Sequence, residues 1–263
     1  MPEPDFSSLR WEVGDGIGTI TLDRPDALNS LDAALKGDLL AVIRAADRDP
    51  AVRAVILTGA GRAVCAGQDL KERLEPDPTP LDVEVRERFN PIILAMRRSP
   101  KPIVAAVNGV AAGAGASLAF AADLRIAAES ATFVLAFGRI GLVPDSGASW
   151  FLPRLVGAAH AAELVYLSDP MPAEEALRIG LVSQVVPADH LMDHARTLAA
   201  KISQGSPSAI ALTKRALARS LEVGLAEALD HEASLQGIAG RSPDHAEGIA
   251  AFVEKRPPRF GGG

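Results

Sequence analysis

The stretch IVAAVNGVAAGAGASLAFAA, residues 103–122, decides how this chain folds. Its first five residues form an apolar run typical of a strand, and Asn108-Gly109 marks a turn. Small residues from 110 to 117 then lead into an apolar helix over 118–122. A strand that ends in glycines and feeds a helix leaves backbone N–H groups unpaired, and these stabilise a developing negative charge. Tight packing of a small-residue helix explains the pattern equally well.

The same stretch is uncharged over a length that would span a bilayer. It is rich in Ala and Gly, however, and it contains Asn108 and Ser117. Lys101 and Asp123 stand at its two ends. We therefore expect a central buried helix and no contact with a membrane.

A second tight turn follows at GLVPDSG, residues 141–147. Asp145 stands in this turn among apolar neighbours that include Leu142 and Trp150. A carboxylate in such surroundings is partly desolvated, which raises its pKa and makes it a usable proton carrier near neutral pH. Capping of the next helix is the alternative role for Asp145, and the residues alone slightly favour the cap.

Upstream, the segment 53–70 repeats the plan of the central stretch. The apolar strand 53–58 ends in a glycine-rich loop, GAGRAVCAGQDL at 59–70, that starts a helix. Two such units side by side would direct two backbone N–H groups at one oxygen atom. Before them, 9–13 and 17–22 predict a hairpin around Gly14-Asp15-Gly16, and about 32–48 predicts an amphipathic helix.

The rest of the chain favours an α/β core followed by helices. Residues 74–81 predict a surface loop with three prolines, and 83–98 a helix kinked near Pro91. Short strands are expected at 124–127, 132–134 and 182–186, and helices at about 148–155, 158–167, 173–179 and 189–203. Helices alone follow from Ser206. We expect a core over residues 1–203 and a helical C-terminal region over 204–263.

Composition excludes several classes of protein. The chain has 263 residues, 48% of them hydrophobic, which is ample for one large domain. Its net charge of −6 argues against nucleic-acid binding. Its single cysteine, Cys65, and an N-terminus without a basic flank or an apolar run indicate a cytoplasmic protein. The histidines offer no metal site, because His190-x-x-x-His194 lacks the glutamate of a zinc hydrolase.

Several motifs in register resemble the crotonase superfamily of enoyl-CoA hydratases and isomerases, over nearly the whole chain. They are LDRP with LN (22–29), LTG (57–59), CAGQDL (65–70), AVNGVA (106–111), GLVP (141–144), GLV (180–182) and AFVEKR (251–256). The resemblance implies a spiral of ββα units with a C-terminal helical region that builds trimers, often paired into hexamers. It also implies an acyl-CoA thioester ligand and no separate cofactor.

The resemblance also implies roles for individual residues. The backbone N–H groups of Gln68 and Ala114 would hold the thioester oxygen and so stabilise an enolate. Contacts with the CoA moiety would come from the segments that match the family's motifs and from basic side chains. These residues are Arg24, Ala27, Ala66, Gln68, Asp69, Leu70, Lys71 and, from a neighbouring subunit, Lys255.

The departures from the family pattern point to one branch. A hydratase of this family uses two glutamates, and their positions are occupied here by Ser117 and Phe137. The segment 133–154 instead resembles the isomerase branch, in which one acid at the position of Asp145 moves the proton. It is most similar to phenylacetate-pathway isomerases, which convert ring-1,2-epoxyphenylacetyl-CoA into oxepin-CoA or shift a 3-enoyl double bond to position 2. Phe137, Leu142 and Trp150 would then line an apolar acyl pocket.

Two other functions stay open. One is a general enoyl-CoA hydratase, which Ser117 and Phe137 disfavour. The other is a non-catalytic acyl-CoA-binding protein of the same fold, in which the glycines serve packing and Asp145 only caps a helix.

Overall fold

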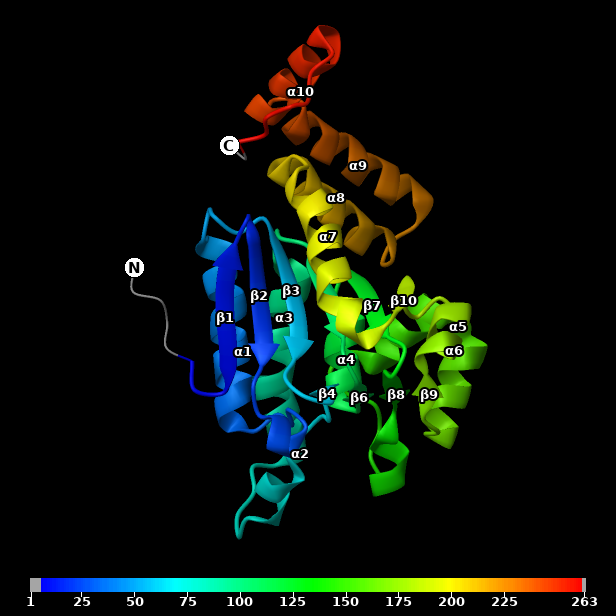
Figure 1. The fold of residues 1–263 in the computed structure, drawn as a ribbon. Coiled ribbons are helices and arrows are strands. Elements are labelled where there is room, and N and C mark those ends of the chain that lie inside the picture. Colours follow the sequence, from blue (N-terminus) through cyan, green and yellow to red (C-terminus); the bar gives the residue numbers. More distant parts are fainter. Residues whose placement is uncertain (1–5, 262–263) are drawn as a thin grey trace.

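Two mostly parallel sheets, each with one antiparallel pair at an edge, form the core of the computed structural model, which describes residues 6–261 (Figure 1). The large sheet has the spatial order β1 (Leu9–Gly14), β2 (Ile17–Leu22), β3 (Ala54–Gly59), β5 (Ile103–Val107), β7 (Leu124–Ala128) and β10 (Gln184–Val186). The small sheet has the order β4 (Ala63–Cys65), β6 (Val110–Ala112), β8 (Thr132–Val134) and β9 (Met171–Pro172). Met1–Asp5, on which the expectation of a cytoplasmic protein partly depends, lie outside the described residues.

Helices follow the strands along the chain. They are α1 (Ala33–Arg48), α2 (Leu81–Glu84), α3 (Asn90–Arg98), α4 (Ala114–Ala121), α5 (Ala148–Leu167), α6 (Ala173–Arg178), α7 (Leu191–Ser203), α8 (Pro207–Ser220), α9 (Leu225–Ala239) and α10 (Pro243–Glu254). Shorter turns are η1 (Pro25–Ala27), η2 (Leu70–Leu74), η4 (Ala136–Ile140) and η5 (Ala188–His190), with a π turn, η3 (Val85–Phe89). No helix of the described residues has the length and hydropathy needed to cross a bilayer.

The order of the two sheets shows a repeated ββα turn. Strands β3, β5 and β7 are neighbours in the large sheet, and the strands that follow them, β4, β6 and β8, are neighbours in the small sheet in the same order. Each turn of the chain therefore adds one strand to each sheet before a helix returns. This arrangement sets the loop after β4 beside the start of α4, as the shared plan of the two glycine-rich segments predicts.

Apolar side chains on the two faces of the large sheet pack against different helices. Leu57 belongs to the main core with Leu35 of α1 and Ile92 of α3, whereas Ile56 belongs to a second core with Leu191 of α7. The alternation follows from the two-residue period of a strand. A sheet covered on both faces holds its strand ends rigidly, which is what a site built on backbone N–H groups requires.

Most elements expected from the sequence are present, and three differences have physical causes. Helix α4 begins at Ala114 rather than at 118, because Gly113 with φ 51° ends the preceding strand and frees the next residues for the helix. The kink expected near Pro91 is the π turn η3 just before it. Of the small sheet, only β8 was predicted, because strands of two or three residues carry too little pattern.

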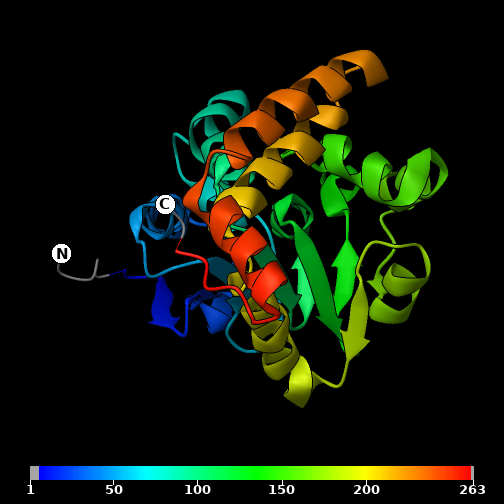
Figure 2. The same ribbon diagram turned by 90° about the horizontal axis from the view of Figure 1, so that it is seen from above.

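The C-terminal helices α8, α9 and α10 lie together at one end of the molecule, beyond α7 (Figures 1 and 2). Helix α8 is attached to the core through Lys214, whose ammonium donates to the carbonyls of Met96 and Lys101 and to Asp123. Arg53 of the core donates to the carbonyl of Phe260, close to the C-terminus.

Candidate active site

Two backbone N–H groups meet where β4 and α4 come together. Leu31 pairs with the segment after β4: its N–H donates to Gly67 O at 2.7 Å, and the N–H of Asp69 donates to Leu31 O at 3.1 Å. Successive peptide groups of an extended chain point to opposite sides, so the N–H of Gln68 points away from Leu31. Ala114 is the first residue of α4, and its N–H has no acceptor within the helix.

Gly67 is the point of closest approach between these two segments. A Cβ atom at this position would lie 2.8 Å from Ala112 O and 3.3 Å from Ala114 N, and the residue has φ 91°. Only glycine combines this backbone conformation with such close contact. Among residues 6–261, neither Gln68 N–H nor Ala114 N–H has a hydrogen-bond acceptor. Two unpaired N–H groups on neighbouring segments are the kind of donors that an oxyanion hole needs, and the helix dipole of α4 adds positive potential at Ala114.

Asp145 is tied to the start of α4 through Ser117. The Ser117 hydroxyl is fully buried and lies 3.1 Å from Asp145 O and 3.2 Å from Gly113 O. The Ser117 hydroxyl thus links the turn that carries the Asp145 carboxylate to Gly113, the residue before Ala114. The N–H of Ala148 also donates to Asp145 O, at 2.9 Å. These bonds hold the Asp145 backbone near the first turn of α4.

The Asp145 carboxylate is half-buried, and within the described chain its only hydrogen-bond donor is the Ser146 hydroxyl, at 2.9 Å from Oδ1. Burial raises the pKa of Asp145 above its usual range, and the bond from Ser146 offsets part of that rise. Helix α5 is preceded by Gly147, with no side-chain cap. The alternative in which Asp145 caps this helix is therefore wrong.

Apolar side chains cover the same region. Phe137 is buried, and its ring tip would be 3.9 Å from a Cβ atom on Gly113. Leu142 donates its N–H to Phe137 O and packs against the main core. Trp150 is half-buried on α5, with its ring edge-to-face on Phe151 at 4.9 Å. Phe137 and Leu142 thus lie beside the α4 terminus, and Trp150 stands further along α5.

The residues expected to contact CoA fall into two places. Ala66 donates its N–H to Leu28 O, next to Ala27 in η1, and the exposed side chains of Leu70 and Lys71 follow in η2. Lys255 is exposed directly after α10, and α10 lies at the opposite end of the molecule from the segment that contains η2 (Figure 1). Within one chain, the residues expected to contact CoA therefore lie together, with the exception of Lys255.

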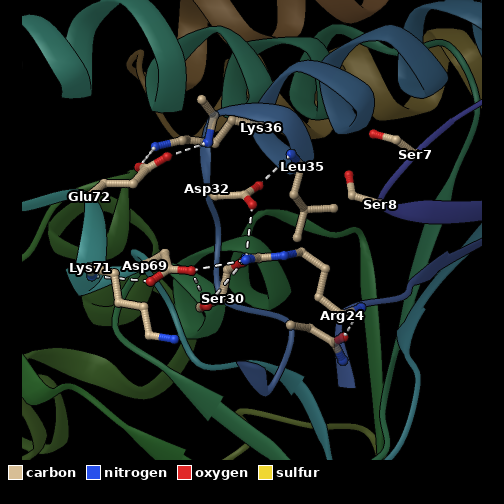
Figure 3. A network of polar contacts seen from close by, with 12 residues as sticks. Ser7, Ser8, Arg24, Ser30, Asp32, Leu35, Lys36, Asp69, Lys71 and Glu72 are labelled. Carbon is tan, nitrogen blue, oxygen red and sulfur yellow. Dashed lines mark hydrogen bonds and ion pairs between the residues drawn. The ribbon is translucent and has the colours of Figure 1, made fainter. Parts of the chain in front are cut away.

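Arg24 and Asp69 belong to a polar network that the sequence does not reveal (Figure 3). Arg24 Nη2 lies 3.0 Å from Asp32 Oδ2 and 3.1 Å from Asp69 Oδ2. Asp69 also caps η2 by accepting the N–H of Lys71. Sequence reasoning missed Ser30, Asp32, Ser146 and the role of Ser117. It missed them because their partners are distant in the sequence or because no motif marks them.

The Cys65 thiol is not available as a nucleophile at neutral pH. Cys65 is buried next to Gly67, and burial raises the pKa of its thiol to about 12, so the thiol stays protonated. Among residues 6–261, no group of three or more His, Cys, Asp or Glu side chains is placed to hold a metal ion.

Comparison with known proteins agrees with this geometry. The profile of the family described as enoyl-CoA hydratase/isomerase matches residues 12–263. A Rhodobacter capsulatus protein named "Probable enoyl-CoA hydratase" is 45% identical over 257 residues, covering 98% of this chain and 99% of its own. The 1,2-epoxyphenylacetyl-CoA isomerase of Escherichia coli is 42% identical over 254 residues, covering 95% and 97%.

A solved structure of an enoyl-CoA hydratase from Bacillus anthracis superposes with a TM-score of 0.91 at 36% identity, covering 98% of this chain and all of its own. The chain thus belongs to the enoyl-CoA hydratase/isomerase family of crotonase-fold enzymes. The ββα spiral and the C-terminal helices expected from the sequence are confirmed.

Proposed function

We propose that this protein is an acyl-CoA isomerase in which Asp145 moves a proton on a thioester enolate. The observation that carries the proposal is one carboxylate with a raised pKa, on a residue whose backbone carbonyl Ser117 holds beside the helix that supplies Ala114 N–H. The positions at which a hydratase of this family would carry its two glutamates hold Ser117 and Phe137. One is committed to a backbone hydrogen bond, and the other is an apolar side chain beside Gly113.

The chemistry uses three groups of this chain. The N–H groups of Gln68 and Ala114 bind the thioester oxygen, and the Asp145 carboxylate takes a proton from the carbon next to the thioester. The electron pair of that C–H bond moves into the enolate, whose negative charge the two N–H groups stabilise. For a 3-enoyl thioester, the protonated Asp145 returns the proton to carbon 4, and the double bond ends at position 2. One carboxylate suffices because the proton leaves and returns on one face.

The substrate we favour is ring-1,2-epoxyphenylacetyl-CoA, a 3-enoyl-CoA, or both. The relative from Escherichia coli that bears the first activity in its name supports this choice, as does an apolar wall that includes Phe137. In the epoxide reaction, the protonated Asp145 assists ring opening on the way to the oxepin. Lys71 would meet the CoA phosphates, and Lys255 would do so from another copy of the chain, within a trimer or a pair of trimers.

The test is product analysis with purified protein. We expect turnover of the epoxide or of the 3-enoyl thioester, followed by ultraviolet absorbance and mass spectrometry. Asp145→Asn should lower kcat about 10²–10⁴-fold and leave thioester binding intact, because proton transfer by a positioned carboxyl contributes that much. An Asp145→Asn variant with full activity would remove this residue from its role.

Hydration is the second candidate function, because other relatives are named hydratases. A 2-enoyl-CoA should be included as substrate, since a hydratase adds the mass of one water to it and an isomerase does not. Tight binding of acyl-CoA with no turnover of any thioester would instead favour the non-catalytic binding protein.

A further inference from the structure

Arg24 is surrounded by carboxylates (Figure 3). Its Nη2 atom lies 3.0 Å from Asp32 Oδ2 and 3.1 Å from Asp69 Oδ2, and its Nη1 donates to the carbonyl of Ser30. One guanidinium between two carboxylates leaves this group of three with a net negative charge. A phosphate approaching Arg24 would meet that charge and would have to compete with two existing ion pairs.

Asp69 is fixed by every donor around it. Its Oδ2 accepts from Arg24 and from the Ser30 hydroxyl at 3.1 Å, and its Oδ1 accepts the N–H of Lys71 at 3.2 Å. Burial alone would raise the pKa of Asp69, yet the bonds from Lys71 N–H, Arg24 and Ser30 lower it below its usual range. The side chain is therefore ionised and immobilised at neutral pH.

The fixed residue is the direct neighbour of an oxyanion-hole donor. Gln68 stands between Gly67, whose carbonyl accepts the N–H of Leu31, and Asp69, whose N–H donates to Leu31 O. Arg24 joins Asp69 to Asp32, one residue after Leu31, and so connects the two bridged segments at the point where Gln68 leaves its N–H unpaired. The direction of that N–H depends on both anchors.

We infer that Arg24 is a positioning residue for the oxyanion hole, acting through Asp69 on the Gln68 N–H group, rather than a ligand of the CoA phosphates. This rests on the proposed function, because that function assigns Gln68 N–H to the thioester oxygen. Without Arg24, the carboxylates of Asp32 and Asp69 would repel each other and the segment would move. Since a displacement of about 1 Å costs up to about 100-fold in rate, we expect kcat to fall roughly 10- to 100-fold.

A substrate without phosphates separates the two roles. Turnover by Arg24→Gln is compared on an acyl-CoA and on the same acyl group carried by pantetheine, which lacks the nucleotide. A positioning role predicts the same loss of kcat on both thioesters. A phosphate contact predicts a higher KM for the CoA thioester alone and unchanged kinetics on the pantetheine thioester, which would overturn the inference. Lys71→Gln, at an exposed lysine, gives the size of a phosphate effect for comparison.

Asp69→Asn also separates the two roles, and it serves if Arg24→Gln fails to fold. The amide still accepts the N–H of Lys71, but it loses the charge that holds Arg24. If Arg24 positions Gln68, kcat falls on both thioesters. If Arg24 binds phosphate, the substitution frees it, so that KM for the CoA thioester falls or stays the same while kcat is retained.

The carbonyl stretching frequency of a bound thioester reports the hydrogen bonds directly and does not need turnover. For phenylacetyl-CoA labelled with ¹³C at the carbonyl, binding to the wild type should lower the frequency, and Arg24→Gln should reduce that change. An unchanged shift in the variant would overturn the positioning role. A normal shift in a wild type that turns nothing over would remove only the proposed isomerase activity. No shift in the wild type would remove the oxyanion hole and the positioning role together.

Discussion

Asp145 combines two opposing influences on one carboxylate. Burial disfavours its charge, whereas the Ser146 hydroxyl donates to it. Ser146 is itself buried and has φ 51°, a left-handed conformation that costs free energy for any residue with a side chain. Gly147 continues the left-handed turn with φ 82°. A strained serine beside a partly desolvated acid is typical of a site shaped for proton transfer.

The pH dependence of activity should follow from these influences. The carboxylate must be ionised to act as a base, so kcat/KM should fall at low pH, with the midpoint above the ordinary Asp pKa of about 3.9. Ser146→Ala removes a bond that lowers the pKa of Asp145. The fall of kcat/KM at low pH (the acid limb) should therefore move to higher pH, while the plateau value of kcat/KM is kept. Ser146→Gly should shift the limb in the same way and also raise the melting temperature by relieving the strain. A limb in the same place in both variants would show that Ser146 does not act on the carboxylate.

The same pKa shift predicts an effect on stability. Because the pKa of Asp145 is raised in the folded protein, the folded state binds a proton more tightly than the unfolded state, and stability is lost as pH rises through the folded pKa. Asp145→Asn should therefore increase the free energy of unfolding at pH 7, and this gain should vanish below about pH 3.9, where the carboxyl is protonated in both states. Equilibrium denaturation at the two pH values checks it; an equal gain at both would contradict the charge argument.

At the scale of elements, the site depends on how closely β4 and α4 approach each other. A Cβ atom on Gly115 would be 2.1 Å from Cys65 O, and one on Gly67 would be 2.8 Å from Ala112 O. The small residues around 110–117 therefore fit both explanations that the sequence left open. They allow tight packing, and the packing brings the two N–H groups together.

Gly67→Ala should damage both packing and chemistry. The added methyl group collides with Ala112 O at a residue whose φ is 91°, so we expect a loss of about 1–3 kcal/mol in stability. A displaced donor should also lower kcat by about 100-fold or more. Gly157→Ala in α5 is the matched control, because it has φ 78° but no atom within 4 Å of the new methyl. Equal losses of activity in both variants would mean that backbone strain, and not the contact at β4, is responsible.

The sequence predicts these elements well where the pattern is local. The apolar runs of β3 and β5, the glycines that follow them and the turn at 141–147 are each readable from a few neighbouring residues. The bond from Ser117 to Asp145 spans 28 positions, and that from Arg24 to Asp69 spans 45. Such contacts depend on the packing of whole turns of the spiral, and no local pattern contains them.

For the molecule as a whole, the attachment of the C-terminal helices depends on Lys214. Its ammonium is buried and donates to two carbonyls and to Asp123. Lys214→Met would remove the buried donor that these three acceptors share, although Asp123 keeps Arg97 and the Ile103 N–H. It should lower stability by about 3 kcal/mol, measured by denaturant unfolding. Lys201→Met, at an exposed lysine of α7, should change stability by less than about 0.5 kcal/mol. Similar values for both would show that Lys214 does not anchor α8.

The exposed apolar side chains of the C-terminal region predict self-assembly. Phe252 is 86% exposed and Val253 73% exposed on α10, which is unusual for such residues on a free surface. If α10 contacts another copy, Phe252→Glu should reduce the mass measured by sedimentation to that of a single chain. Tyr166→Glu, at an 82% exposed aromatic on α5, tests whether any exposed aromatic has this effect. An unchanged mass for Phe252→Glu would place the contact elsewhere.

The bond between Ser117 and Asp145 also bears on how such a protein changes activity over evolutionary time. A glutamate at position 117 would supply a second acid but remove the hydroxyl that holds the turn carrying the first. Neither acid would then be well placed until the turn had been rebuilt. We therefore expect that single substitutions toward hydration pass through poorly active intermediates, so that lineages with the two chemistries stay apart once they have separated.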